Sequence, residues 1–366
     1  MNSMKKILFL TNMYPSHKDP SYGIFVKKTY EWLKEEYEVT LVKICRTENS
    51  LLKVWSYFSF YFQAIVMGCL GNFDCVYAHY ISHCALPIRF IRKIKKNILI
   101  IGNIHGEDVF SEYEEYKKNK IKSTYFINNG DYIISPSEYY KSKLCKDYAV
   151  AENRVFVSPS GGIDTTFFRS IDREICRKKI GLEKERIYIG YVSRIEKGKG
   201  WDIFIRSVRE LKEKNINIYG IIVGYGSEMK DLKQFVEENN ISERVVLFPL
   251  LSHDDLVYVY NSMDLFCFPS SREAESLGLV GLEAMACEIP CIITNNEGPS
   301  SYAKDGYNCL QFDPHNETEL EEKILELLNM DIKQKEALVS NARKTALLFD
   351  KVKVKDDFNA FFKEVL

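Results

Sequence analysis

Two glutamates eight positions apart, Glu275 and Glu283, are the residues of this 366-residue chain whose spacing most clearly suggests chemistry. They belong to the segment 270–290, SSREAESLGLVGLEAMACEIP, in which Gly278 permits a tight turn and a helix is expected to begin near Leu279. The N–H groups and the positive dipole end of such a helix can bind a diphosphate. Carboxylates in the same place suit sugar hydroxyl groups, which donate hydrogen bonds to them. The alternative is a solvated helix face, where most glutamates lie.

A possible source of positive charge lies in the segment 193–200, SRIEKGKG, which also follows an apolar stretch. Arg194 offers a planar fork of donors and Lys199 a point charge, and both could reach a diphosphate leaving group. Together they could neutralise the charge that develops on the leaving oxygens, without a metal ion. The alternative is a solvent-exposed turn, which a KGKG string normally forms.

The first half of the chain offers weaker candidates. His105 ends an apolar stretch, although a lone histidine is more often structural, and His79 ends another. Gly23 lies in the loop PSYGIF at 20–25, and Gly224 lies in a GYG turn at 224–226. Each glycine could simply mark a turn, and a single GxG is weak support for a ligand site.

These candidates follow short apolar runs that alternate with amphipathic stretches along the chain. Continuous apolar runs are typical of parallel strands that are buried on both faces, so the alternation predicts an α/β fold of doubly wound sheets. The helix-like stretches include 25–36, 88–96, 202–214 and 228–238. The predicted strands are 7–11, 39–44, 75–79, 98–104, 132–135, 155–158, 187–192, 218–223, 245–248, 265–268, 291–294 and 309–312.

The strand pattern restarts after a glycine-bearing and charged stretch at 158–185, which predicts two domains with a site in a cleft between them. We expect an N-terminal domain at 1–165 and a C-terminal domain at 166–345. The tail 346–366 should form a helix that packs back on the N-terminal domain. Its apolar face would carry Phe358, Phe361, Phe362 and Val365.

The motif ESLGLVGLEAMAC, with Glu275 and Glu283 separated by seven residues, resembles the signature of family 4 of the retaining glycosyltransferases. Proteins of this family have the GT-B fold, in which two Rossmann-like domains face each other across a cleft. The resemblance implies that the domain at 1–165 binds the acceptor and that the domain at 166–345 binds the nucleotide-sugar. The resemblance implies that Glu283 binds the ribose hydroxyls and that Glu275 contacts the transferred sugar. It also implies that the backbone amides of Leu277, Gly278 and Leu279 hold the diphosphate.

The resemblance extends over nearly the whole chain in the expected order. It implies that Arg194 and Lys199 form the phosphate clamp, and that His105 lies near the transferred sugar. Gly23 and Gly224 match glycine turns that contact the donor or the acceptor. His79 matches a family position that we interpret as structural or acceptor-side.

The chain departs from the family pattern at three places. Ser193 and Pro249 stand where most members have glycine, and the turn at 158–164 lacks the usual asparagine. Proline has no N–H group and a fixed φ, so the contacts to the nucleotide base could differ and the base is not predicted.

The resemblance implies that the chain is a retaining, metal-independent transferase that needs no cofactor. Its donor would be a nucleotide-sugar, and its acceptor a glycan or a lipid-linked molecule, as in the assembly of surface polysaccharide. A nucleotide-sugar epimerase of the same fold, which would turn over its donor without an acceptor, is one alternative. A non-catalytic nucleotide-sugar-binding partner subunit is another.

The composition and the lengths of the apolar runs limit the possible partners, metal sites and location of the protein. A formal net charge of −1 gives no general basic field for nucleic acid, so we expect none as a partner. The ten cysteines contain no CxxC pair, and with six histidines at other spacings they predict free thiols rather than a zinc site. We expect a cytoplasmic protein, since the first apolar run is too short for a signal peptide and no stretch is long enough for a membrane span. The basic stretch 89–96 and the aromatic stretch 57–62 could contact the inner face of the membrane, although a solvated helix and a core helix are the simpler interpretation.

Overall fold

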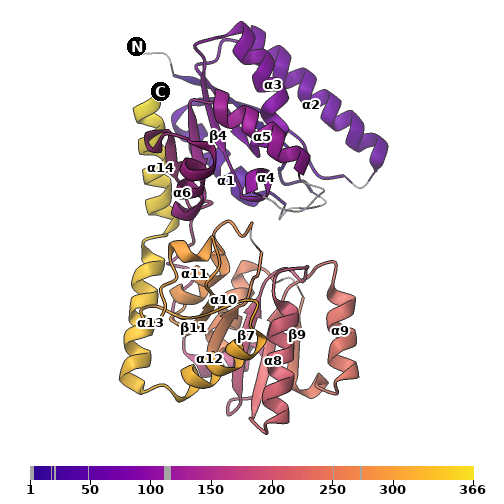
Figure 1. The fold of residues 1–366 in the computed structure, drawn as a ribbon, viewed down its shortest axis with the longest axis vertical. Coiled ribbons are helices and arrows are strands. Elements are labelled where there is room, and N and C mark those ends of the chain that lie inside the picture. Colours follow the sequence, from indigo (N-terminus) through magenta and orange to yellow (C-terminus); the bar gives the residue numbers. More distant parts are fainter. Residues whose placement is uncertain are drawn as a thin grey trace. The chain divides into compact units, whose positions relative to one another are not determined.

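Two six-stranded parallel sheets carry the fold, one in each of two units (Figure 1). The computed structural model describes residues 4–17, 19, 22–47, 49–110, 117–249, 251–272 and 274–366. Unit 1 comprises Met1–Gly161 and Val352–Leu366, and unit 2 comprises Gly162–Lys351. The predicted α/β fold is therefore confirmed. The chain passes between the units at 161/162 and 351/352, where the sequence suggested 165/166 and 345/346.

The sheet of unit 1 has the strand order β2-β1-β3-β4-β5-β6. Every neighbouring pair is parallel, so each connection must cross over a face of the sheet. The strands are β1 (Lys6–Thr11), β2 (Glu38–Lys43), β3 (Cys75–His79), β4 (Leu99–Asn103), β5 (Tyr132–Ser135) and β6 (Val155–Val157).

Helices cover both faces of this sheet. One face packs on α1 (Ile24–Glu36) and α14 (Lys351–Val365), which bring Val26, Leu33 and Phe358 to strand residues such as Phe9 and Tyr77. The other face packs on α2 (Ser50–Leu70), α3 (Ile81–Ile94), α5 (Lys117–Asn129) and α6 (Glu138–Tyr148). The short helix α4 (Glu107–Phe110) follows β4. Because both faces are covered, the central strands β1, β3 and β4 are mainly apolar, as the sequence pattern predicted, whereas the edge strand β2 exposes Glu38 and Lys43.

Unit 2 repeats the plan with the strand order β12-β11-β10-β7-β8-β9. Its strands are β7 (Ile187–Val192), β8 (Ile218–Val223), β9 (Val245–Phe248), β10 (Leu265–Phe268), β11 (Cys291–Thr294) and β12 (Leu310–Phe312). Its helices are α7 (Arg173–Ile180), α8 (Trp201–Glu213), α9 (Met229–Glu238), α10 (His253–Ser262), α11 (Leu279–Ala286), α12 (Glu317–Asn329) and α13 (Ile332–Leu347).

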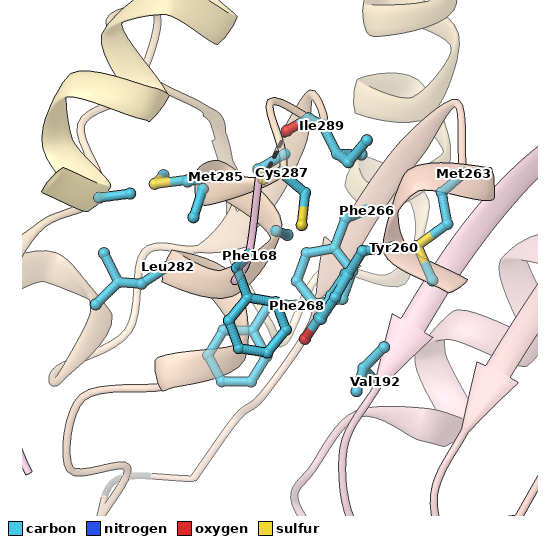
Figure 2. Packing of buried hydrophobic residues seen from close by; sticks show 14 of the residues in the cluster. Phe168, Val192, Tyr260, Met263, Phe266, Phe268, Leu282, Met285, Cys287 and Ile289 are labelled. Carbon is cyan, nitrogen blue, oxygen red and sulfur yellow. Dashed lines mark hydrogen bonds between the residues drawn. The ribbon is translucent and has the colours of Figure 1, made fainter. Parts of the chain in front are cut away.

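Two apolar cores lie on opposite faces of the unit 2 sheet. Helices α8, α9 and α12 supply one core, and α10, α11 and α13 contribute to the other. Figure 2 shows the second core, in which the ring of Tyr260 lies between Phe168 and Phe266, at centroid distances of 5.9 and 5.6 Å. This packing fixes α10 and α11 against the sheet near the end of β10.

Helix α3 begins seven residues earlier than predicted, at Ile81 rather than Ile88. Proline usually interrupts a helix interior. In the structure Pro87 lies inside the helix. The buried side chains Ile81, Cys84 and Ala85 precede it on the face that enters the core, and their packing outweighs the lost backbone hydrogen bond.

The contribution of α14 to unit 1 can be measured with Phe358→Ala. Phe358 is 1% exposed, and its ring lies 5.8 Å from that of Trp32. Deleting a buried phenyl group should lower the free energy of unfolding of unit 1 by about 3–5 kcal/mol, as followed by urea denaturation. Val352→Ala on the same helix, where the side chain is exposed, should change it little. An equal loss in both variants would show that α14 does not belong to this core.

Candidate active site

The strand order of unit 2 singles out the edge where β7 and β10 end. From β7 the chain adds β8 and β9 on one side, and then returns to add β10 on the other. The loops that follow β7 and β10 therefore leave the sheet in opposite directions. In open α/β sheets, ligands bind beyond the carboxyl ends of the strands at such a switch point. Lys199 lies in the loop after β7, and Glu275 in the loop after β10.

Lys199 and Glu275 form a buried ion pair at this switch point. The Lys199 Nζ lies 2.6 Å from Glu275 Oε2, and each residue is 8% exposed. The Ser270 hydroxyl donates a second hydrogen bond to the same oxygen, at 2.9 Å. Burial alone would raise the pKa of Glu275, but the Lys199 ammonium and the Ser270 hydroxyl outweigh it and hold that pKa below its usual value. Glu275 is therefore ionised at neutral pH.

The other predicted cation, Arg194, lies closer to solvent. Its side chain is 59% exposed, and Nη1 lies 3.0 Å from Glu196 Oε2. Arg272 approaches the same carboxylate oxygen at 3.9 Å from its more buried position. The loop after β7 thus places Lys199 inside the protein and Arg194 at its surface.

Close glycine contacts hold three loops together at this edge. A Cβ atom on Gly200 would lie 1.9 Å from the carbonyl oxygen of Pro269, so the loop after β7 touches the loop after β10. A Cβ atom on Gly224 would lie 1.9 Å from the carbonyl oxygen of Ser193, so the loop after β8 touches the loop after β7. The structure therefore brings Gly224 next to the segment that holds Arg194 and Lys199.

Helix α11 begins at the same edge, as predicted. Gly278 precedes it in the left-handed conformation, with φ at 76°, and no side chain caps the helix start. The N–H groups of the first turn, including that of Leu279, are therefore suited to an anion. Leu277, the residue before the glycine, is buried. The Tyr302 hydroxyl donates to the Gly278 carbonyl oxygen at 2.9 Å and fastens the helix start to the unit.

Glu283 lies in the second turn of α11 and is 9% exposed. The Tyr260 hydroxyl donates to its Oε2 at 2.9 Å, which fixes the orientation of the carboxylate. Burial, and then the charge of Glu283, raise the pKa of Tyr260 well above its usual value, so the phenol keeps its proton. A carboxylate held in this way can still accept hydrogen bonds from vicinal hydroxyl groups.

In unit 1, His105 and His79 lie side by side at the ends of β4 and β3. His79 Nδ1 lies 3.0 Å from His105 Nε2, and the rings stack at a centroid distance of 5.2 Å. On the far side, His79 Nε2 lies 3.0 Å from the Tyr77 hydroxyl, which accepts a hydrogen bond from Asn103 Nδ2 at 2.9 Å. These contacts form a chain of four polar side chains through the interior of unit 1.

The direction of this chain follows from its donors. Burial lowers the pKa of His79 well below its usual value and that of His105 to about 3, so both rings are neutral at physiological pH. Because Tyr77 already accepts from Asn103, we infer that its own proton is directed to His79 Nε2. His79 then carries its proton on Nδ1 and donates it to His105 Nε2. His105 is left with Nδ1–H as the donor it can offer to a ligand.

Gly23 lies beside this pair of histidines. It precedes α1 in the left-handed conformation, with φ at 76°, and two residues later the ring of Phe25 lies 5.0 Å from that of His105. Pro20 and Ser21, which belong to the same predicted loop, lie outside the described residues, as does Leu250 of the predicted base-binding loop.

Several residues of these clusters were not predicted from the sequence. Ser270 and Arg272 accompany Glu275, Tyr260 accompanies Glu283, and Tyr77 with Asn103 orients the histidines. Each stands in or just after a strand, or on a neighbouring helix, where the sequence pattern indicates core. For Tyr77 and Asn103, the signal in the sequence is a polar residue within an apolar strand.

Other features of the chain lie apart from these clusters. A hollow of about 620 Å³, lined by residues that include Arg173, Arg177 and Asn261, contains none of the predicted site residues. All ten cysteines are free thiols. Within the described ranges, no group of three or more His, Cys, Asp or Glu side chains is arranged to hold a metal ion.

Comparison with known proteins relates the chain to one family. Residues 172–345 match the family model described as glycosyl transferases group 1. An uncharacterized glycosyltransferase from Methanocaldococcus jannaschii is 28% identical over 333 residues, which cover 88% of this chain and 84% of that protein. A capsular polysaccharide biosynthesis glycosyltransferase from Staphylococcus aureus is 30% identical over 223 residues, which cover 58% of this chain and 56% of that protein. The chain thus spans most of the first relative and about half of the second.

Solved structures share the fold over nearly the whole chain. Sucrose-phosphate synthase from Thermosynechococcus elongatus superposes with a TM-score of 0.80 at 17% identity and covers 99% of both chains. The Anabaena protein HepE, solved in complex with UDP, superposes with a TM-score of 0.75 at 19% identity and covers 98% of this chain and 100% of its own. At this level of identity the likeness concerns the fold, which is the GT-B fold.

The Lys199–Glu275 pair can be tested by its energetics. Lys199→Met leaves a buried carboxylate without its cation, which should lower the free energy of unfolding of unit 2 by about 3–5 kcal/mol in urea at pH 7. The lowered pKa of Glu275 makes its contribution complete above its unfolded pKa near 4.5, and the contribution is lost as the pH falls through the folded value. The deficit of Lys199→Met should therefore shrink in acid.

The second variant, Lys199→Met with Glu275→Gln, removes both charges and should recover most of the loss. The matched control is Lys230→Met, at an exposed lysine of α9, which should have little effect. If the double variant is no more stable than the single one, the loss comes from packing and not from an unpaired charge.

The direction of the histidine chain can be read by NMR of ¹⁵N-labelled imidazoles. The wild-type protein should show His79 protonated at Nδ1 and His105 protonated at Nδ1. Tyr77→Phe removes the donor to His79 Nε2, so His79 should become a mixture of the two tautomers. Tyr132→Phe, on strand β5, is the control and should leave both signals unchanged. A wild-type His79 protonated at Nε2 would contradict the proposed direction.

Proposed function

Residues 172–345 belong to the glycosyl transferases group 1 family, and from this premise we propose that the chain is a retaining, metal-independent glycosyltransferase. It would move a sugar from a nucleotide-sugar donor to a glycan or lipid-linked acceptor. The observation that carries the proposal is the buried Lys199–Glu275 pair, which lies at the β7/β10 switch point and just before the uncapped start of α11. One place in unit 2 thereby offers a cation, a carboxylate and free backbone donors.

The donor would lie across these groups. The N–H groups of Leu277, Gly278 and Leu279 would hold the diphosphate, and Glu283 would accept hydrogen bonds from the ribose hydroxyls. Glu275 would accept from hydroxyl groups of the transferred sugar. Because its carboxylate is already held by Lys199 and Ser270, it needs little reorganisation to do so.

In the reaction, the bond between the anomeric carbon and the diphosphate oxygen breaks, and an acceptor hydroxyl oxygen forms the new bond. The proton of that hydroxyl passes to the leaving diphosphate or to water. Negative charge accumulates on the leaving diphosphate. An ammonium group has three N–H donors, and the contact with Glu275 uses one, so Lys199 can also bind a leaving oxygen. Arg194 would approach from the surface after leaving Glu196. These two cations and the helix dipole would supply the stabilisation that a metal ion gives elsewhere.

Unit 1 would contribute the acceptor side and His105. The histidine chain leaves His105 neutral with an N–H to offer, which suits a sugar hydroxyl better than a phosphate. Gly23, in the loop beside it, would allow close approach of a ligand to the backbone.

Two of the similar proteins indicate which donor and which product to test first. HepE was solved in complex with UDP, so uridine diphosphate sugars are the first donors to try. The Staphylococcus aureus relative acts in capsular polysaccharide biosynthesis, which supports a surface polysaccharide as the product class.

The donor assignment can be tested by thermal shift with a panel of nucleotide-sugars in EDTA. The cognate donor should raise the melting temperature of the wild-type protein without added metal. Glu283→Gln keeps the size of the side chain but removes the carboxylate, and should weaken donor binding by about 1.5–3 kcal/mol. Glu237→Gln, at an exposed glutamate of α9, is the matched control and should bind the donor normally.

Equal shifts in the wild-type protein and in Glu283→Gln would refute the site assignment. Product analysis with the donor so identified separates the alternative functions. Transfer to an acceptor with the donor's anomeric configuration supports the proposal. A changed sugar formed without an acceptor indicates an epimerase, and binding without any turnover indicates a partner subunit.

A further inference from the structure

Helix α2 carries apolar side chains on two opposite faces. One face enters the core of unit 1, where Phe60 and Ala64 are fully buried. The other face is exposed. Five of its residues form what we call the α2 stripe: Leu51, Trp55, Phe58, Phe62 and Val66.

The α2 stripe is continuous along the helix. Its members are spaced four, three, four and four residues apart, which is the spacing of one helical face. Trp55 and Phe58 stack on each other at a centroid distance of 5.6 Å, and with Phe62 they are 60–66% exposed. An exposed apolar surface of this extent marks an interaction site.

Helices α3 and α5 extend the surface beside α2. Helix α3 packs against both α2 and α5, and Figure 1 shows the three helices on the same side of the unit 1 sheet. Helix α3 exposes Leu86, Phe90 and Ile94 at a spacing of four residues, and α5 exposes Ile121.

The same three helices contain no aspartate or glutamate. Helix α2 carries Lys53, α3 carries Arg89, Arg92 and Lys93, and α5 carries four lysines. The whole chain has 51 acidic residues against 50 basic ones, so this segregation of positive charge is a local property of these helices. Lys118, Lys120 and Lys122 of α5 are exposed.

We propose that α2, α3 and α5 dock unit 1 on an anionic bilayer surface. The α2 stripe would enter the boundary between headgroups and acyl chains, and the exposed basic side chains would meet the lipid phosphates. Arg92 does not take part, because it is paired with Asp131 at 2.7 Å. Leucine, valine and phenylalanine in a row offer nothing to a nucleic-acid backbone, and they suit a bilayer flanked by basic side chains. Within the described part of the chain, no helix is long and apolar enough to cross a membrane, and one face of α2 belongs to the core. The helix therefore lies along the surface. This contact goes beyond the proposed function; if that function holds, it would bring a lipid-linked acceptor to unit 1.

The test uses the intact chain without any donor, so its result does not depend on the proposed reaction. Vesicles of phosphatidylcholine alone and vesicles that also contain phosphatidylglycerol are sedimented with the protein. Binding should be strong to the anionic vesicles and weak to the neutral ones. Of the three tryptophans, Trp55 is exposed while Trp32 and Trp201 are not, so the fluorescence should shift to shorter wavelength on binding.

Two sets of substitutions separate the apolar and charged contributions. Trp55→Ser with Phe58→Ser and Phe62→Ser should abolish sedimentation with both kinds of vesicle. Lys118→Gln with Lys120→Gln and Lys122→Gln should weaken binding to anionic vesicles roughly 100-fold, since each cation near the surface contributes a factor of about five. Controls on unit 2 are Ile175→Ser with Ile332→Ser, and Lys230→Gln with Lys233→Gln, all at exposed positions. Both controls should bind as the wild type does. Circular dichroism verifies that every variant is folded.

Other occupants of the surface would give different results. The proposal is overturned if the wild-type protein binds neither kind of vesicle. It is also overturned if the variant with the three serine substitutions in the α2 stripe still binds. If the wild-type protein ignores vesicles but is a dimer that the stripe variant converts to a monomer, the surface is an interface between two copies. If only an oligonucleotide binds, and the lysine variant loses it, the partner is a nucleic acid.

Discussion

Most residues of a parallel strand that is covered on both faces must be apolar, so polar side chains collect mainly at the strand ends, and this constraint organises both units. The carboxyl end of each strand lies at the same edge of its sheet as those of its neighbours. Lys199, Glu275 and Gly224 all follow strands of unit 2, and His79 and His105 end or follow strands of unit 1. Because helices cover both faces of each sheet, polar residues gather at the carboxyl ends of the strands, where a ligand can also bind.

The Lys199–Glu275 cluster of unit 2 and the His79–His105 cluster of unit 1 stabilise buried polar groups in opposite ways. In unit 2, two full charges are buried together, and the pair holds the pKa of Glu275 low. In unit 1, burial removes charge from the histidines, and a directed chain of neutral hydrogen bonds remains. The first arrangement suits an ionic ligand and the second suits an uncharged one. This difference fits a nucleotide diphosphate in one unit and sugar hydroxyls near the other.

Most strands could be predicted from the sequence because a doubly covered strand has a distinct apolar run. The start of α11 could be predicted because Gly278 marks it. The direct pairing of Lys199 with Glu275 could not, since 76 residues separate them and only the β7/β10 adjacency brings them together. Tyr77 and Asn103 were missed for a similar reason. Tyr77 contacts His79, two residues along the same strand, and Asn103 contacts Tyr77 from the neighbouring strand. The pattern of a single strand does not show which side chains meet. The predicted helix-like stretch at 88–96 missed the first turns of α3, because the packing of Ile81 depends on residues that are distant in the sequence.

The return of the chain to unit 1 has a consequence for biosynthesis. Phe358, Phe361 and Phe362 belong to the unit 1 core, yet they are translated after all of unit 2. Unit 2 is one continuous segment and contains every residue of its own core. Unit 1 is discontinuous: until α14 has been made and has packed beside α1, part of one face of its sheet lacks its cover.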